Sequence, residues 1–86
     1  MSYALSQNLR IVSTGEQMII MDVKQGKFYT CNQIGATIVN LLRSGHTLDS
    51  IAETLEEQSK QSHNRIKNDI LLFMQTLVQK NLCHVS

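Results

Sequence analysis

The side chains in this sequence that could do chemistry are, first of all, its histidines and cysteines. Histidine supplies general acids and bases, and cysteine supplies nucleophiles and metal ligands. The cysteines are far apart in the chain, no CxxC pattern occurs, and no histidine stands at a zinc-ligand spacing. No histidine has a cysteine or serine beside it in a recognisable nucleophile motif. We therefore expect neither a catalytic site nor a metal site from Cys31, Cys83, His46, His63 and His84.

Glu53, Glu56 and Glu57 are the other candidates for acid–base chemistry, because paired carboxylates can act as general acid and base. They fall on the polar side of a predicted helix, which indicates a solvated face. The glycines are isolated from one another, so no phosphate-binding loop is predicted. The sequence therefore predicts a protein that is not an enzyme and uses no cofactor.

Length and composition support the same view. The chain has 86 residues, a formal net charge of +1 and 42% apolar residues. A chain this short is expected to form one domain with a thin stability margin and little room for a deep catalytic cleft. Its near-neutral balance gives no bulk attraction to nucleic acid or to an anionic membrane. The N-terminus has no apolar targeting segment, so we expect a cytoplasmic protein.

The first part of the domain is predicted to be an antiparallel β-meander. β-prone runs alternate with turn signals at 14–16 and 24–26, where Gly26 suits a short hairpin loop. The run 18–21 is apolar on both faces, which is typical of a central strand covered on both sides. Residues 1–8 are expected to be a flexible tail before a single domain over 9–86. The strands are expected at about 9–13, 17–23 and 27–31.

The third strand is an outer strand of this meander. Tyr29 and Cys31 share one face with the stem of Lys27, while Phe28 and Thr30 share the other. An outer strand leaves backbone N–H and C=O groups unpaired unless something covers them. Two interpretations stay open at this point. Either a partner binds along the edge, or the edge is solvated and Lys27 discourages pairing with another strand.

From residue 32 onward the apolar period becomes helical. The third helix carries an apolar stripe at Ile66, Ile70, Phe73 and Leu77, and further apolar residues widen the stripe beyond one face. Either this is the central core helix, or part of the excess faces a groove that a partner fills. The helices are expected at about 33–43, 48–58 and 63–81, with the caps Asn32, Thr47 and Ser62.

This order of elements predicts an α+β fold that is winged helix-turn-helix-like, with a three-stranded antiparallel meander followed by three helices. A winged-helix DNA-binding regulator is therefore the alternative function. Charge argues against it, because residues 46–86 hold four basic and five acidic residues and are net −1. A DNA-binding module normally carries a basic stripe over its recognition helix.

One segment resembles a known family. Residues 26–38 are GKFYTCNQIGATI and resemble the pattern G-x-Y/F-Y-x-L-N-x-x-G-x-x-I of PqqD-like proteins, which recognise peptides in pathways that make and modify ribosomal peptides. Residues 41–48, LLRSGHTL, and the third helix continue the match, which covers roughly 9–84. Cys31 stands where the family usually has leucine, and Val39 where many members have tryptophan. A looser pocket is expected at the cysteine, with no redox role.

The resemblance implies a non-catalytic protein that binds the leader peptide of a ribosomal precursor. The leader adds as an antiparallel strand to the third strand, in the cleft against the third helix, and is delivered to a separate maturation enzyme such as a leader peptidase or cyclase. The chain looks most like the stand-alone leader-binding proteins of lasso-peptide biosynthesis. The expected peptide-binding residues are Lys27, Phe28, Tyr29, Thr30, Cys31, Ile66, Asp69, Ile70, Phe73, Met74 and Leu77.

Two further expectations concern Asp69 and the partners. Asp69 either accepts a hydrogen bond from the leader or from a strand group, or pairs with Arg65 one helical turn earlier. The expected partners are the leader and the maturation enzyme, with no nucleic acid and no membrane. A homodimer that exchanges its edge strand is a third possibility.

Overall fold

The computed structural model describes residues 3–15 and 17–85. Its larger sheet is antiparallel, with β3 (Gln17–Asp22) between β2 (Leu9–Thr14) and β4 (Lys27–Cys31). Three helices follow the sheet, so the predicted α+β fold is confirmed. Each strand begins at the predicted residue and ends within one residue of the predicted end, because period and turn signals are local.

Asp22 organises the turn between β3 and β4, although its side chain is only 1% exposed. Its Oδ1 accepts from the backbone N–H groups of Lys24 and Gln25, at 2.9 Å each, and its Oδ2 accepts from the Ser6 hydroxyl and the Gln25 side-chain amide. Gly26 completes the turn at φ +73°, a conformation that strains other residues. The Ser6 hydroxyl first, and then the backbone donors, hold the pKa of Asp22 below its ordinary value.

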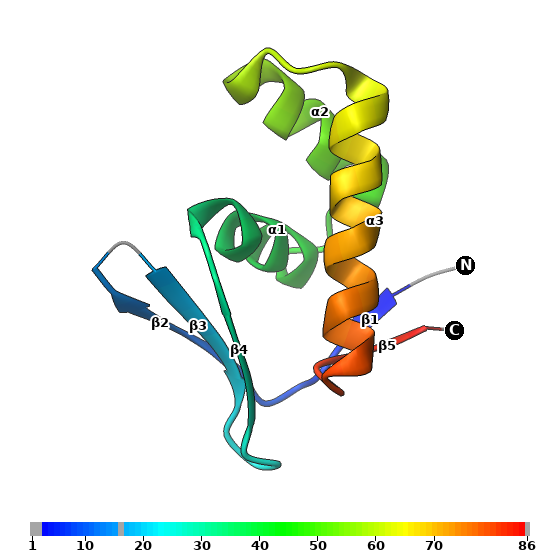
Figure 1. The fold of residues 1–86 in the computed structure, drawn as a ribbon. Helices are drawn as coiled ribbons and strands as arrows, with labels where there is room; N and C mark the ends of the chain where they lie inside the picture. The colour runs from blue at the N-terminus through cyan, green and yellow to red at the C-terminus, as the bar shows by residue number, and fades with distance from the viewer. Residues whose placement is uncertain (1–2, 16, 86) are drawn as a thin grey trace.

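A second sheet joins the two ends of the chain. β1 (Tyr3–Leu5) pairs antiparallel with β5 (Cys83–Val85), beside the lower end of α3 (Figure 1). This corrects the expectation of a flexible tail over 1–8, of which residues 1–2 lie outside the described residues. Strands this short carry too few residues for a period, and the partner of β1 lies at the far end of the sequence.

The helices are α1 (Gln33–Arg43), α2 (Leu48–Ser59) and α3 (His63–Gln79). Their first residues are the predicted ones, because the side chains of Asn32, Thr47 and Ser62 accept hydrogen bonds from N–H groups in the first turns. α3 ends two residues before the predicted end, because Asn81 takes a left-handed conformation (φ 61°). The N–H of Leu82 then donates to the carbonyl of Leu77, which turns Leu82 into the core.

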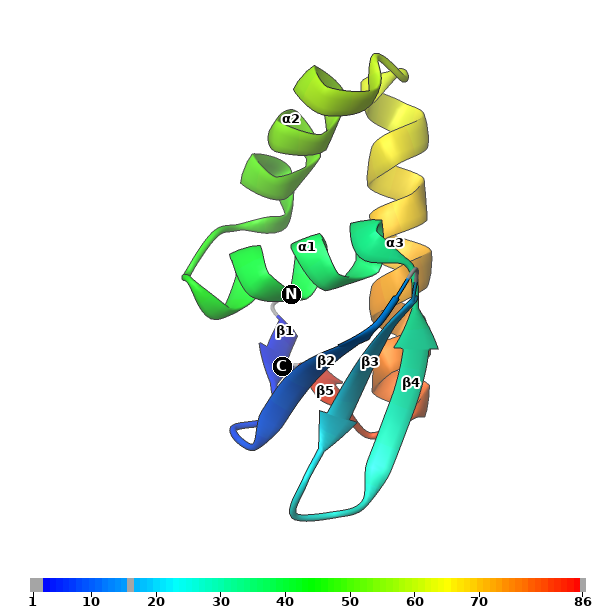
Figure 2. The ribbon, with the colours of Figure 1, turned by 90° about the vertical axis from the view of Figure 1, so that its left-hand side faces the viewer.

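The helices lie on one side of the larger sheet, and α1 and α3 cross close to it (Figures 1 and 2). One face of the sheet joins the core through Leu9 and Ile20, and the core is completed by helix residues together with Leu82 and Cys83. The expectation of a middle strand covered on both faces is therefore wrong. Ile19 and Met21 are half-buried by neighbouring strands rather than by a second layer.

Two polar pairs fasten α2 to α3. His63 Nδ1 lies 3.0 Å from Glu56 Oε2, and Lys67 Nζ lies 2.9 Å from Asp49 Oδ1. Within residues 3–15 and 17–85 these are the two salt bridges, so the pair of Asp69 with Arg65, one of the two alternatives for Asp69, does not form. No helix in the described residues is long and apolar enough to span a membrane.

Candidate functional site

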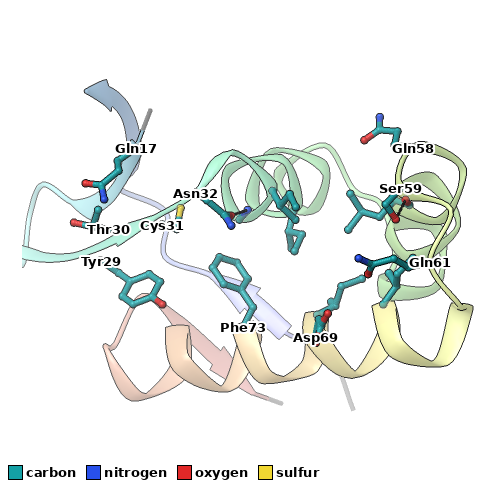
Figure 3. A pocket seen from close by; sticks show the side chains of 16 residues that line it. Gln17, Tyr29, Thr30, Cys31, Asn32, Gln58, Ser59, Gln61, Asp69 and Phe73 are labelled. Carbon is teal, nitrogen blue, oxygen red and sulfur yellow. Dashed lines mark hydrogen bonds between the residues drawn. The ribbon is translucent and has the colours of Figure 1, made fainter. Parts of the chain in front are cut away.

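A cleft of about 750 Å³ lies between β4 and the helices. One wall is β4 and the start of α1, the opposite wall is α3, and the far end is closed by the end of α2 (Figure 3). Phe73 projects from α3 into the space between these walls, and Gln58, Ser59 and Gln61 gather at the far end (Figure 3). The cleft therefore extends past the end of the strand into a space lined by helices.

The cleft has an apolar floor and a nearly uncharged lining. Ile38, Leu55, Ile66 and Ile70 form the floor and are almost wholly buried. Asp69 is the one charged side chain among the described residues that line the cleft, and it is exposed. Such a surface suits an extended, mostly apolar chain segment better than a charged small molecule.

The open edge of β4 borders this cleft. In an antiparallel sheet, every second residue of a strand directs its N–H and C=O groups to the same neighbouring strand. The N–H of Val23 donates to the carbonyl of Asn8, so these two residues form a hydrogen-bonded pair between β3 and β2. The next pair, Asp22 with Leu9, is therefore not hydrogen-bonded. Asp22 directs its backbone groups to the other neighbouring strand, β4. It follows that Phe28 and Thr30 direct their backbone groups away from β3, to the free edge.

A close contact at Gly35 joins α1, β4 and α3 at the mouth of the cleft. A Cβ atom at this position would lie 2.9 Å from Cys31 Cβ and 3.0 Å from Phe73 Cε1. The ring of Phe73 also lies 6.2 Å from that of Tyr29, centroid to centroid, at a tilt of 55°. The absence of a side chain at Gly35 is therefore what lets the Phe73 ring and Cys31 pack against α1.

Cys31 is the one thiol side chain among the described residues that line the cleft. Burial raises the pKa of its thiol, and a hydrogen bond from the backbone of Ala36 offsets this in part. A thiol kept protonated in this way is a poor nucleophile. No group of three or more metal-ligating side chains occurs in the described residues.

The predicted site residues fall into three groups. Seven line the cleft: Tyr29, Thr30, Cys31, Ile66, Asp69, Ile70 and Phe73. Lys27 and Phe28 are exposed and lie outside the cleft, although the backbone of Phe28 remains on the free edge. Met74 and Leu77 are fully buried in the core and do not line the cleft, so we remove them from the candidate site. Their positions on α3 face the other elements, whereas Phe73, one residue before Met74, faces the cleft.

Sequence reasoning missed the contribution to the cleft of the start of β3, of α1 with its cap, and of α2 with the segment after it. The residues concerned are Gln17, Asn32, Ile34, Gly35, Ile38, Leu55, Gln58, Ser59 and Gln61. The contribution of α1 could have been predicted from the local sequence, because Asn32 caps α1 directly after β4 and so places the first turn of the helix at the strand edge. The part from α2 depends on how the helices pack.

The fold and the cleft together define a small α+β domain with one open strand edge beside a helix-lined groove. The chain belongs to the PqqD family: the family model described as coenzyme PQQ synthesis protein D (PqqD) matches residues 17–82. A search of curated proteins found no match.

Two solved structures are similar to this chain over nearly its whole length. One is TbiB1 in complex with the TbiA(beta) leader peptide, with a TM-score of 0.81, 16% identity and 95% of each chain covered. The other is lasso peptide synthetase B1 complexed with the leader peptide, with a TM-score of 0.82, 20% identity, and 96% of this chain and 98% of that chain covered. At these identities the likeness shows a shared fold.

Proposed function

We propose that this chain binds the leader peptide of a ribosomal precursor by β-strand addition. The leader pairs antiparallel with β4 and lies in the cleft against α3. The observation that carries the proposal is the free edge of β4, where the backbone groups of Phe28 and Thr30 border an apolar cleft. Family membership and the leader-bound structures that share the fold support it.

Strand addition divides the work between backbone and side chains. Main-chain hydrogen bonds to β4 supply affinity that depends little on sequence. Side chains of an added strand alternate between the two faces of the sheet. Those on the face of Tyr29 and Cys31 enter the cleft, where Phe73 and Ile70 meet them. Those on the other face lie beside Phe28.

The function of the chain in this proposal is recognition and delivery without catalysis. A separate maturation enzyme, a leader peptidase or another modifying enzyme, acts on the precursor while this chain holds the leader. Binding both partners raises the effective concentration of substrate at the enzyme. The proposal places the chain in the cytoplasm, where ribosomes release the precursor. A lasso-peptide pathway fits best, since one of the two similar structures is lasso peptide synthetase B1 and both are complexes with a leader peptide.

Titration with a synthetic leader tests this function. The probes are fluorescently labelled leader peptides, followed by anisotropy. The first is the leader of a precursor peptide identified from the gene neighbourhood of this chain, and the second is the TbiA(beta) leader. We expect saturable binding of the first probe. The matched control carries proline at alternate positions, which removes the N–H groups that an added strand donates, and it is expected not to bind.

Two results would contradict the proposal. One is the absence of saturable binding by either leader, and the other is equal binding of the proline-containing control. Duplex DNA is a further titrant, because DNA-binding domains share the winged-helix layout. Binding to DNA and not to a leader would favour the alternative function, a DNA-binding regulator. Light scattering on the free chain tests the third possibility, since a strand-exchanged dimer would occupy the edge of β4 with a second copy.

A further inference from the structure

The lining of the cleft changes character beyond the end of β4. Beside the strand it is apolar and aromatic, with the rings of Tyr29 and Phe73 6.2 Å apart. Further along, Asp69 lies on the α3 wall between Phe73 and the polar side chains that come from the end of α2 (Figure 3). We call this hydrogen-bonding section the polar end of the cleft and define it as Gln58, Ser59, Gln61 and Asp69.

The polar end carries negative charge. Asp69 is exposed, and neither of the two salt bridges in the described residues includes it. α2 ends here at Ser59, because Lys60 takes a left-handed conformation (φ 59°). The last carbonyl groups of a helix lack intrahelical partners and bear partial negative charge, which favours a cation. None of the basic side chains in the described residues lines the cleft.

The proposed direction of the leader brings its upstream part to the polar end. β4 runs from Lys27 to Cys31, so an antiparallel leader runs from beside Cys31 to beside Lys27. The leader residues that precede the one opposite Cys31 therefore lie beyond the strand. There they pass the first turn of α1, which lines the cleft through Ile34, and continue toward the end of α2.

Helix and strand geometry give the position of the leader residue that reaches Asp69. The ring contact with Tyr29 places Phe73 level with the end of β4. Asp69 is four residues earlier on α3, which is about 6 Å nearer to the end of α2. An extended chain advances about 3.3 Å per residue, so this distance corresponds to about two leader residues. A long side chain reaches Asp69 from about two to four residues before the one opposite Cys31.

We propose that the polar end of the cleft binds a lysine or arginine side chain of the leader, at a position that precedes the segment paired with β4. This inference rests on the proposed function and adds the chemical class of one leader residue to it. The Asp69 carboxylate is the counter-ion. The side-chain oxygens of the other three residues accept the remaining N–H donors of the cation.

The cost of covering Asp69 is the physical reason for a cation at this position. A leader that lies over the polar end removes the Asp69 carboxylate from water, and an unpaired carboxylate in that place is strongly unfavourable. An apolar leader side chain leaves the charge unpaired, and an acidic one repels it. A lysine or arginine instead forms a charge-assisted hydrogen bond with it. Asp69 is therefore a specificity-determining residue in this proposal.

The test is a double-mutant cycle between Asp69 and the leader, measured by fluorescence anisotropy. The probe is the labelled leader of a precursor identified from the gene neighbourhood of this chain. In a second set of peptides, each lysine or arginine of that leader is replaced by glutamine, one at a time. The proteins are the wild type, Asp69→Asn and Glu53→Gln. Glu53→Gln is the matched control, because Glu53 is exposed on α2, lies outside the cleft and loses the same charge.

We expect Asp69→Asn to bind the unmodified leader about tenfold more weakly than the wild type does, and Glu53→Gln to match the wild type. One glutamine replacement, before the segment paired with β4, should weaken binding to the wild type by a similar factor. The same replacement should leave binding to Asp69→Asn unchanged, because the partner charge is already gone.

Three results would overturn the inference. They are equal affinity of the wild type and Asp69→Asn, additive losses in the cycle, and tight binding of a leader that has no lysine or arginine before its paired segment. A wild type that binds no leader, or that binds the proline-containing control equally well, is a different result and overturns the proposed function itself.

Discussion

At the scale of single residues, Asp22 is the buried carboxylate that holds the turn between β3 and β4. It joins the N-terminal segment to the β3–β4 turn through Ser6 and the turn backbone. These donors stabilise the carboxylate, which is why its pKa is lowered. The turn leads into β4, the strand that is proposed to bind the leader, so its order bears on function as well as on stability.

Asp22→Asn should make the protein less stable at neutral pH and less sensitive to acid. The folded-state pKa is below the unfolded value of about 3.9, so the stabilisation is complete above that value and is lost as pH falls through the folded pKa. Urea unfolding of both proteins between about pH 2 and 7 measures the effect.

Asp49→Asn is the control for this change. The Lys67 ammonium lowers the pKa of Asp49 as well, but the Asp49 side chain is 70% exposed. An exposed pair contributes little, so Asp49→Asn should resemble the wild type. Equal effects of the two variants would show that the buried network has no special part in stability.

Gly35→Ala should narrow the mouth of the cleft. The added methyl group would lie about 3.0 Å from the Phe73 ring and as close to Cys31, so the ring has to move. We expect a stability loss of about 1–3 kcal/mol from overpacking and a leader affinity that falls by about tenfold. The double variant Gly35→Ala/Phe73→Leu makes room for the methyl group and should recover stability. Unchanged affinity in Gly35→Ala would show that this contact does not set the width of the cleft.

At the scale of elements, the free edge of β4 is the feature on which the proposed function depends. Thr30→Pro removes an N–H group that points to this edge, and should lower leader affinity by about tenfold or more. Ser13→Pro is the matched control, because alternation directs the backbone groups of Ser13 to the free edge of β2. Both variants should lose similar stability. Equal loss of leader binding by both would show that β4 has no special part in it.

The start of α1 gives a second comparison between elements. Asn32 and Thr47 cap α1 and α2 in the same way, each accepting a hydrogen bond from an N–H three residues on. Replacing either with alanine should cost about 1 kcal/mol in the free energy of unfolding. Because Asn32 lines the cleft, only Asn32→Ala should also weaken leader binding, as anisotropy would show. Weakening by both would indicate an indirect effect of stability.

At the scale of the whole molecule, the cleft and the paired termini lie on different parts of the fold. β1 and β5 form their own sheet, outside the residues that line the cleft. Hydrogen exchange with and without the leader should therefore show slower exchange at the amides of Phe28 and Thr30, and no change in β1 and β5. Slowing spread equally over both sheets would instead indicate a global gain in stability.

Features that depend on short-range signals in the sequence agree with expectation, whereas features that depend on contacts across the chain do not. Asn32, Thr47 and Ser62 mark the helix starts correctly, because a cap acts within three residues. The open edge of β4 also follows from the order of short-range hairpins. By contrast, β1 and β5 were missed, because their pairing spans the chain and neither strand has a period of its own.

The candidate site shows the same division within α3. The apolar excess of this helix left open whether it meets core or groove, and the structure shows both. Phe73 and Ile70 line the cleft, while Met74 and Leu77 are fully buried. The choice depends on the rotation of α3 against α1 and β4, which packing at Gly35 helps to set.

The sequence by itself determined β2, β3, β4, the three helices, their order and the family pattern, since hydrophobic period, caps and turn residues act over a few neighbours. Only the tertiary structure decided which apolar side chains of α3 reach the cleft, that α1 and α2 extend it, and that one face of the sheet stays uncovered. Those outcomes depend on contacts between residues far apart in the chain, where burial of one side chain is settled by the shapes of all the others.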